Sequence, residues 1–215
     1  MKRVLIAAVA LFSGATAWAG SIDTSFIEAP WPRQRVHETE VGRYAVRWRE
    51  RASKQEGIFA SVRFAAPLGQ PAVWDLANQY QDVGKITPGV TAVRYLERSE
   101  THEKIEVDVK VLWKALTLAF DVEKGPPRVV RFRLVNKALG EYRGLCLFES
   151  STGSEGQAGP STSVELATWL KPSRPVPMRL LLLVERIALL QGARHFLEEC
   201  DKHVARSKLQ ASVSN

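Results

Sequence analysis

Histidine and cysteine, the residues that most often bind zinc or form nucleophile–base pairs, are few and widely separated in this chain. The four histidines are His37, His102, His195 and His203, and no two of them have the H-E-x-x-H spacing that a zinc-protease helix requires. The two cysteines lack the C-x-x-C spacing of a structural zinc site. A G-x-S-x-G nucleophile elbow and a glycine-rich turn that opens a helix are also missing from the sequence. We therefore predict no metal site, no cofactor and no catalytic residue of these classes.

Cys146 and Cys200 are candidates for a disulfide, and the sequence leaves their state open. An oxidising compartment permits the bond. Its geometry requires two Cα atoms within about 7 Å, which a sequence separation does not determine. Two buried and unpaired thiols are the alternative.

The acidic residues of the predicted strands point to water rather than into a cleft. Glu106, Asp108 and Glu165 alternate with apolar residues, so solvation explains them without acid–base chemistry. Three polar side chains instead share the parity of the inward, apolar positions: Tyr95, Tyr142 and Thr168. A buried tyrosine hydroxyl needs a hydrogen-bond partner, which either a ligand or a backbone carbonyl would supply.

Most of the chain from Tyr44 onward alternates apolar and polar residues with a period of two. This pattern is typical of antiparallel strands that have one packed face and one face in water. A polar turn joins the first two strands into a predicted hairpin, and Pro67 ends the second of them. We predict strands near residues 44–49, 58–64, 93–95, 105–113, 116–122, 130–134, 142–148 and 163–171.

Helical periodicity is confined to two places in the chain. A short amphipathic helix follows Pro71, with a second helical turn predicted over residues 82–86. Residues 178–203 contain no proline and carry a wide apolar stripe, which predicts one long amphipathic helix. Its run of five apolar residues is too short to span a membrane. About seven strands followed by one long helix indicate an α+β domain.

The inward strand positions and the apolar stripe of the long helix form the predicted interior. Each buried apolar side chain stabilises a fold by ~1.5–3 kcal/mol, so the same residues suit a solid core or the lining of a ligand cavity. The set is Val62, Phe64, Tyr95, Val107, Val109, Val111, Trp113, Leu118, Phe120, Phe132, Leu134, Tyr142, Phe148, Thr168, Leu183, Ile187 and Leu190.

The first nineteen residues have the pattern of a secretory signal peptide. Lys2 and Arg3 precede an uncharged apolar run over residues 4–12, and Ala17-Trp18-Ala19 matches a small-x-small cleavage site. The apolar run is about half of the ~20 residues that span a bilayer. We predict a signal peptide at 1–19, export to the periplasm or beyond the cell, an irregular lead-in at 20–40, one domain at 41–204 and a flexible tail at 205–215.

The net charge and the distribution of lysine and arginine indicate which classes of partner the protein could bind. The hydrophobic share of 45% and the charged share of 25% are ordinary for a globular protein, and the net charge of +7 is mildly basic. Lysine and arginine alternate singly along strands, as in "RVVRFR", whereas nucleic-acid-binding proteins cluster them on one face. We predict no nucleic-acid partner, and attraction to an anionic membrane surface stays open.

Several segments resemble the START-like, or Bet v 1-like (SRPBCC), superfamily. "VRFAAPLGQPAVWDLANQYQDVGKITPGVTAVRYLERS" has an Ala-Pro step, Ala66-Pro67, at the end of a long strand, and a Val-Trp pair, Val73-Trp74, on the following helix. "EKGPPRVVRFRLVNKALGEYRGLCLFE" and "STSVEL" resemble later strands, and "PVPMRLLLLVERIALLQGARHFLEE" resembles the terminal helix. The chain departs from the family where residues 78–82 replace an acid–aromatic step and where Cys146 replaces an aromatic residue.

The resemblance covers about residues 44–203 and is closest to exported members with an additional leading strand. It implies a helix-grip fold, in which a bent antiparallel sheet of about seven strands wraps around a long C-terminal helix and encloses a hydrophobic cavity. Relatives include polyketide cyclase/dehydrase proteins, lipid carriers and coenzyme Q-binding proteins.

Our first hypothesis for the function is non-enzymatic, although the superfamily also contains aromatase/cyclases and an enzyme stays open. We expect an exported binding or transport protein for a hydrophobic, lipid-like ligand held in the cavity. Two alternatives stay open. One is a cyclase/dehydrase-type enzyme that uses polar groups in the same cavity. The other is a protein-interaction module with a filled core.

Overall fold

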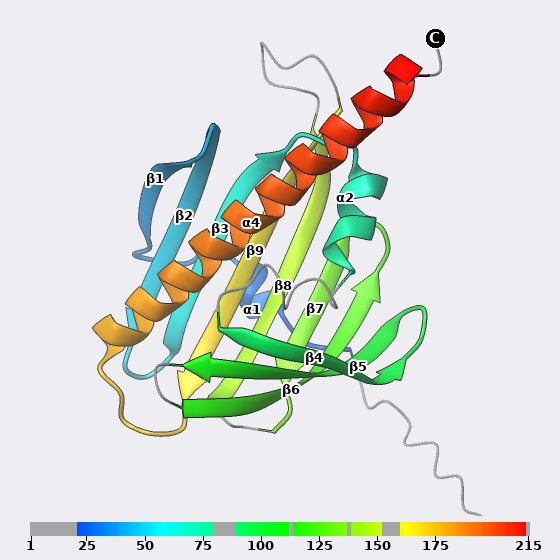
Figure 1. Cartoon of the computed structure of the whole chain (residues 1–215). Helices are drawn as coiled ribbons and strands as arrows, with labels where there is room; N and C mark the ends of the chain where they lie inside the picture. Colours follow the sequence, from blue (N-terminus) through cyan, green and yellow to red (C-terminus); the bar gives the residue numbers. More distant parts are fainter. Residues whose placement is uncertain (1–20, 80–88, 112–113, 137–138, 152–159, 214–215) are drawn as a thin grey trace, which may run out of the picture.

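The structure is a computed structural model that describes residues 21–79, 89–111, 114–136, 139–151 and 160–213 (Figure 1). Its helices are α1 (Ser25–Glu28), α2 (Gln70–Ala77) and α4 (Met178–Val213). Its strands are β1 (Arg35–Val41), β2 (Tyr44–Ser53), β3 (Gly57–Ala66), β4 (Val90–Arg98), β5 (His102–Val111), β6 (Lys114–Gly125), β7 (Val129–Leu134), β8 (Gly140–Ser151) and β9 (Ser161–Pro172).

All of these strands belong to one antiparallel sheet in the order β1-β2-β3-β9-β8-β7-β6-β5-β4. The predicted hairpin of the first long strands is confirmed as the β2–β3 pair. The last strand, β9, inserts between β3 and β8, so the two halves of the sheet are joined by a long-range pairing. The α+β prediction is confirmed, but the described sheet has nine strands rather than about seven.

Strand β1 accounts for an error in the predicted lead-in. Residues 20–40 were expected to be irregular, yet they contain α1 and most of β1. Residues 35–40 are all exposed, because β1 is an edge strand with solvent on both faces. No packed face therefore imposes an apolar alternation on its sequence, and the period-two pattern that revealed the other strands is absent.

The C-terminal helix is longer than predicted. We expected the helix to end near His203 and a flexible tail to follow, but α4 continues to Val213. Residues 204–213 contain no proline and no glycine, and several of them are good helix formers. The helical turn predicted over residues 82–86 lies outside the described residues.

The sheet is strongly bent, and α4 crosses its concave face (Figure 1). Strands β4, β5 and β6 turn across the lower front of the view, whereas β2, β3 and β9 run behind the helix and β1 lies at the outer edge beside β2. α4 packs mainly on β3, with smaller contacts to β2, β1 and α2. The concave surface of β6, β7 and β8 is consequently not the main support of the helix.

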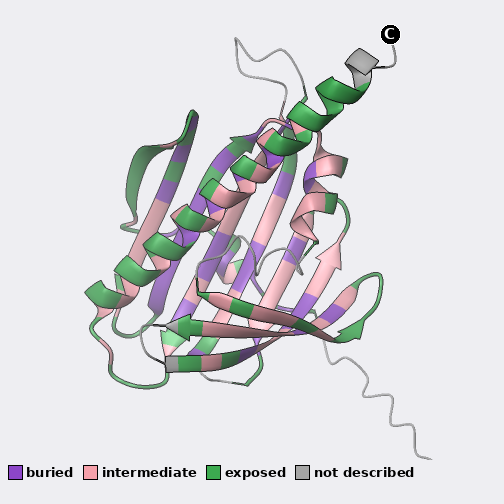
Figure 2. Cartoon of the chain, viewed as in Figure 1, coloured by how far each residue is buried: buried purple, intermediate pink, exposed green. Residues whose placement is uncertain are grey.

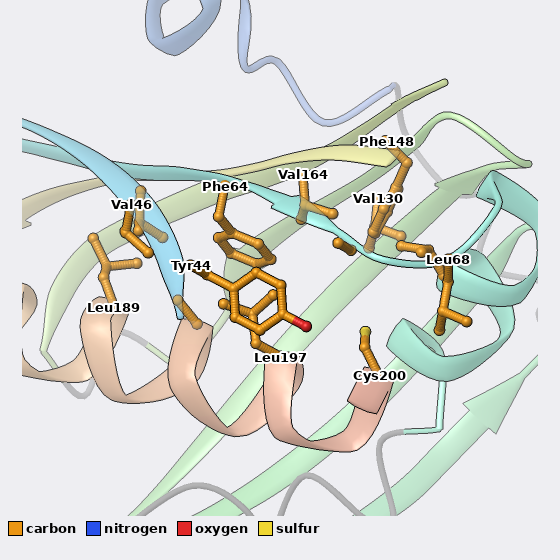
Figure 3. Packing of buried hydrophobic residues seen from close by; sticks show 14 of the residues in the cluster. Tyr44, Val46, Phe64, Leu68, Val130, Phe148, Val164, Leu189, Leu197 and Cys200 are labelled. Atoms are coloured by element: carbon orange, nitrogen blue, oxygen red, sulfur yellow. The ribbon is translucent and has the colours of Figure 1, made fainter. Parts of the chain in front are cut away.

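The main hydrophobic core lies between α4, α2 and the concave face of the sheet (Figure 3). Leu189 and Leu197 of α4 meet Val46 and Phe64 of the sheet, and Val73 anchors α2 to the same cluster. The alternation of the strand sequences produces this core, because every second side chain faces the helix. Trp74 of α2 packs edge-on against Phe148.

A second, smaller cluster covers the convex face of the sheet. Ile27 and Trp31, from the segment around α1, pack against Phe59, Leu145 and Ala167. The indole N–H of Trp31 donates to the carbonyl of Ile27 over 2.8 Å. The N-terminal segment thereby covers the back of β3, β8 and β9 and leaves the concave face to the helices.

Candidate ligand site

Three polar side chains meet inside the bend of the sheet, under the first half of α4. Tyr142 lies on β8 and Glu185 lies on α4. Thr168 lies on β9, where it pairs with Gly144, two residues after Tyr142 on β8. The hydroxyl of Thr168 lies 3.2 Å from Oε2 of Glu185 and 3.3 Å from the carbonyl oxygen of Ala60. We call Tyr142, Thr168 and Glu185 the polar cluster.

Strand parity and helix spacing explain why these residues meet. Tyr142 and Phe148 have the same parity on β8, so both face α4. Thr168 is paired with Ala60 on β3 and shares its concave face. Glu185 is one helical turn before the buried Leu189, so the residue is held on the sheet-facing side of α4.

Burial controls the ionisation of the cluster. Desolvation raises the pKa of Glu185 from 4.5 to about 7, although the hydrogen bond with Thr168 opposes the shift. Desolvation also raises the pKa of Tyr142 well above its usual value, and the nearby charge of Glu185 adds to this effect. Near neutral pH, Glu185 is therefore present in both its neutral and its ionised form, whereas Tyr142 remains a neutral phenol.

The neutral form of Glu185 completes a hydrogen-bond chain. A hydroxyl group has one proton to donate, so Thr168 cannot donate to both of its acceptors at once. When Glu185 is protonated, its carboxyl O–H can donate to Thr168, which donates in turn to the carbonyl of Ala60. When Glu185 is ionised, the hydroxyl of Thr168 can donate either to the carboxylate of Glu185 or to the carbonyl of Ala60, but not to both. A hydrogen bond donated by Thr168 favours the ionised carboxylate, so the raised pKa of Glu185 comes from desolvation, which outweighs that bond.

An aromatic wall surrounds the phenol of Tyr142. The ring centroid of Tyr142 lies 6.2 Å from that of Phe120 and 6.0 Å from that of Phe132, and the two phenylalanine rings meet edge-on at 6.1 Å. Gly144 makes this arrangement fit, because a Cβ at that position would lie 2.2 Å from Cζ of Phe132. Phe120, Phe132 and Tyr142 remain partly accessible to solvent, so they offer apolar surface beside the polar cluster.

A pocket of about 530 Å³ lies at the end of the sheet next to Tyr142. This volume is within the range of small-molecule sites. Gly140 is held there with φ of +111°, and a Cβ would lie 2.3 Å from the carbonyl oxygen of Lys171. The lining comes from the end of β7, the start of β8 and the end of β9, and it consists of Arg133, Leu134, Gly140, Glu141, Tyr142, Arg143, Lys171, Pro172 and Ser173.

Three basic side chains line this pocket, and they differ in whether another side chain already binds them. Arg133 makes two hydrogen bonds to Asp121, at 2.8 and 3.0 Å. Arg143 lies over the rings of Phe26 and Trp169 on the convex side. Lys171 is exposed and takes part in no ion pair of the described residues. Lys171 is therefore the cation at this end of the sheet that is available to an anionic group.

The structure separates the predicted interior residues into distinct groups. Those that are buried are Val62, Phe64, Leu118, Leu134, Phe148 and Thr168. Those that are partly accessible are Tyr95, Val107, Val109, Phe120, Phe132, Tyr142 and Leu190. Trp113 and the side chain of Val111 lie outside the described residues. Tyr95 is on the edge strand β4, where the guanidinium of Arg98 covers its ring at 4.7 Å.

Two of the predicted interior residues require correction. Leu183 and Ile187 are exposed on α4, whereas Leu189 of the same helix is buried. The first half of α4 is apolar on both faces, so its sequence does not indicate which face meets the sheet. The sequence therefore predicts that a wider face of α4 is buried than the structure shows.

The two cysteines are free thiols in the structure, so the disulfide that the sequence left open is not formed. Cys200 is buried on α4, where its side chain points from the helix toward the sheet (Figure 3), and Cys146 lies on β8 among the partly buried residues packed against the core. Desolvation raises the pKa of each thiol to about 12. Neither is a thiolate at neutral pH, so neither is suited to act as a nucleophile.

The carboxylates predicted to point to water take part in ion pairs, and the Glu165 side chain is only 16% exposed. Asp108 bonds Arg94 and Thr117, Glu106 bonds Arg94, and Glu165 pairs with Arg49. These are surface networks of neighbouring strands. Within the described part of the chain, no group of three or more His, Cys, Asp or Glu side chains is arranged to hold a metal ion.

Sequence reasoning identified two members of the polar cluster and missed the third. Tyr142 and Thr168 were recognised by their parity, whereas Glu185 was treated as an ordinary charged residue. A signal was present, because Glu185 is the single acidic residue between Lys171 and Leu197 and has the helical spacing of Leu182 and Leu189. A charged residue in register with a buried face marks a candidate site.

No family model and no curated protein matches the sequence, but solved structures match the fold. The STAR-related lipid transfer protein of Xanthomonas axonopodis has a TM-score of 0.61 at 10% identity, covering 77% of this chain and 98% of its own. The Zhui aromatase/cyclase of Streptomyces sp. R1128 has a TM-score of 0.58 at 15% identity, covering 68% and 94%. A START superfamily protein of Mycobacterium smegmatis has a TM-score of 0.57 at 11% identity, covering 67% and 97%.

These similarities show that the chain has the START-like, Bet v 1-like helix-grip fold that the sequence motifs indicated. At this level of identity the shared property is the fold. Among the described helices, none has a stretch long and apolar enough to cross a bilayer.

Proposed function

We propose that this chain is an exported binding or transport protein for a hydrophobic ligand with one neutral polar end. The observation that carries the proposal is the polar cluster, which lies beside an apolar aromatic wall and a pocket of about 530 Å³. Ligand sites typically combine apolar surface with a few placed polar groups. Similarity to a START superfamily protein and to a STAR-related lipid transfer protein supports the same class of ligand.

The chemistry of the cluster specifies the polar end of the ligand. The Tyr142 phenol is a donor, and the neutral Glu185 carboxyl can donate its one proton either to Thr168 or to a ligand, so the cluster suits a carbonyl, ether or hydroxyl oxygen. A carboxylate on the ligand would be repelled by the ionised fraction of Glu185. The apolar body of the ligand would leave water against Phe120 and Phe132, at roughly 25 cal/mol for each Å² buried.

The direct test is the content of the protein made in its native host. We expect mass spectrometry of the purified protein to reveal a co-purified lipid or isoprenoid, and the delipidated protein to bind an apolar fluorescent probe. Thr168→Val combined with Tyr142→Phe should reduce the co-purified ligand. Tyr95→Phe, on the edge strand β4, is the matched control and should not. Protein that carries no lipid and has no affinity for apolar probes would refute the proposal and favour an interaction module.

Catalysis by the same cluster is the second candidate. A general acid or base works best when its pKa is near the operating pH, and Glu185 meets this condition. A cyclase/dehydrase would release its ligand with the mass of one water removed, whereas a carrier would release it unchanged. Glu185→Gln should abolish such a conversion while ligand binding persists. Recovery of an unchanged ligand from the wild-type protein would assign the cluster to binding alone.

Export is the remaining part of the proposal, and the sequence pattern of residues 1–19 supports it. Cell fractionation should place the protein outside the cytoplasm, and N-terminal sequencing should begin at Gly20. Accumulation of the full-length chain in the cytoplasm would contradict this.

A further inference from the structure

The first half of α4 exposes a row of large apolar side chains to solvent. Leu180, Leu183, Val184 and Ile187 have relative exposures of 51, 50, 46 and 46%. Their spacing of i, i+3, i+4 and i+7 places them on one face of the helix. Leu189 and Ala193, which are buried on α4, lie on the other side. We call the exposed row the outer stripe, and Figure 2 shows exposed bands along α4.

The outer stripe is a local concentration of apolar surface. The other large hydrophobic residues with high exposure in the described chain are scattered. They are Val36 on β1, Leu96 on β4, Val135 just after β7 and Leu209 near the end of α4. Single exposed apolar residues are normal on protein surfaces, whereas contiguous ones mark an interaction site. The stripe is therefore a candidate interaction surface.

Positive charge surrounds the start of α4. Lys171 and Arg174 lie between the end of β9 and the helix, and Arg179 lies in its first turn. All three are exposed, and none has an ion pair among the described residues. We call them the basic rim. Glu185, the acid nearest to Arg179 in sequence, bonds Thr168 in the interior, and the exposed Glu141 lies opposite Lys171 on β8 without an ion pair to it among the described residues.

The charge changes along α4 in a way that gives it a direction. In the second half of the helix Glu198, Glu199 and Asp201 balance the charges of Lys202, Arg206 and Lys208, whereas Arg179 and Arg186 in the first half face only one acid, the interior Glu185. The helix dipole adds partial positive charge at the first turn. The apolar and cationic parts of the surface thus coincide at one end of the molecule, next to the pocket that Lys171 also lines.

From this coincidence we infer that the outer stripe and the basic rim form a docking surface for an anionic lipid bilayer. Apolar side chains beside lysine and arginine are the pattern of interfacial membrane-binding helices. Four half-exposed side chains amount to a few hundred Å², less than the roughly 800 Å² per partner of a stable protein interface, so a second copy of this chain is a poorer fit. The inference deepens the proposed function, because it places the pocket against the membrane that would supply the ligand.

Vesicle flotation with the full-length mature protein tests the inference. We expect binding to phosphatidylcholine vesicles that contain phosphatidylglycerol, weak binding to phosphatidylcholine alone, and loss of binding near 1 M salt, where the Debye length is about 3 Å. The double variants Leu183→Ser/Ile187→Ser and Arg174→Glu/Arg179→Glu should each weaken binding about tenfold or more. Each alters exposed residues, so circular dichroism should remain unchanged.

Matched controls come from the same helix. Leu209→Ser removes an exposed apolar residue from the second half of α4, and Arg206→Glu/Lys208→Glu reverses two exposed charges there. Neither should change vesicle binding by more than about twofold. Equal losses in the controls would overturn the inference, because charge and apolarity anywhere on α4 would then suffice.

Other outcomes separate this inference from the proposed function. Absence of wild-type binding to anionic vesicles would refute the docking surface even if a lipid co-purifies. Concentration-dependent dimerisation in sedimentation velocity, lost in Leu183→Ser/Ile187→Ser, would assign the stripe to a second copy and also refute it. If the protein binds vesicles but neither carries lipid nor binds probe, the docking surface stands and the proposed function fails.

Discussion

Replacing Glu185 with glutamine should stabilise the protein at alkaline pH and leave its stability at acid pH nearly unchanged. The wild-type carboxyl is buried beside Thr168, and its pKa is raised from 4.5 to about 7 in the folded state. Glutamine has nearly the same shape, can donate its amide N–H to Thr168, and never acquires a charge. The substitution thus removes the ionisation without creating a cavity.

The sign and the size of the effect follow from linkage between folding and protonation. Between pH 4.5 and 7 the folded wild type binds more protons at Glu185 than the unfolded chain does, so its free energy of unfolding falls as pH rises. The loss is complete somewhat above pH 7. The raised pKa corresponds to about 3 kcal/mol, since each unit is worth about 1.4 kcal/mol. For a chain of this length that is roughly 6–12 °C in Tm.

Urea unfolding of both proteins from pH 4 to pH 9 measures this directly. Other titrating groups cancel when the wild-type curve is subtracted from the variant curve, so the difference should rise by about 3 kcal/mol between pH 4.5 and 8. Glu141→Gln, an exposed acid on β8, is the control and should give a flat difference within about 0.5 kcal/mol. Parallel pH curves for wild type and Glu185→Gln would falsify the buried, protonated carboxyl.

Three further predictions concern residues around the site and the core. Gly144→Val must displace the ring packed against it and should lower the free energy of unfolding by about 1–3 kcal/mol, whereas Gly192→Ala, where an added Cβ meets nothing within 4 Å, should be neutral or stabilising by up to about 1 kcal/mol. If urea unfolding gave the same change in free energy for both variants, Gly144 would not be closely packed against Phe132 as the structure shows. Glu103→Gln leaves a nearly buried lysine uncompensated and should cost about 3 kcal/mol in the same assay; a change below about 0.5 kcal/mol would show that the ion pair is not buried. Cys146 and Cys200, whose pKa values are raised to about 12, should react with a thiol reagent at pH 8 only after unfolding, and rapid labelling of the native protein would disprove their burial.

The sequence predicted most of the sheet because most strands have one dry and one wet face. The alternation of Val62 and Phe64 with Arg63 is imposed by the core, and so is visible without a structure. β1 has no dry face, so Arg35, Glu38 and Glu40 carry no alternation. The same reasoning explains why a strand count from periodicity falls short at the edge of a sheet.

The candidate site was only partly predictable, because its members are brought together by long-range contacts. Parity placed Tyr142 and Thr168 on the inward face. The rotation of α4 about its own axis decides that Glu185 faces inward and Leu183 outward, and a helix that is apolar all round does not encode that rotation in its hydrophobic pattern. The pocket likewise depends on how β7, β8 and β9 end side by side.

Glu185 is the residue whose presence stability does not explain. A buried carboxyl that ionises near neutral pH lowers the free energy of unfolding, and an apolar or amide side chain in the same place would be more stable. Residues that break a local rule of stability without a structural compensation are concentrated at functional sites. The Thr168 hydrogen bond does not compensate, because a glutamine would make it as well. The presence of an acid at this point, between the aromatic wall and the first half of α4, is accounted for when a ligand oxygen accepts its proton or its hydrogen bond. The Glu185→Gln protein separates these two roles: it keeps a donor for binding and has no proton to transfer.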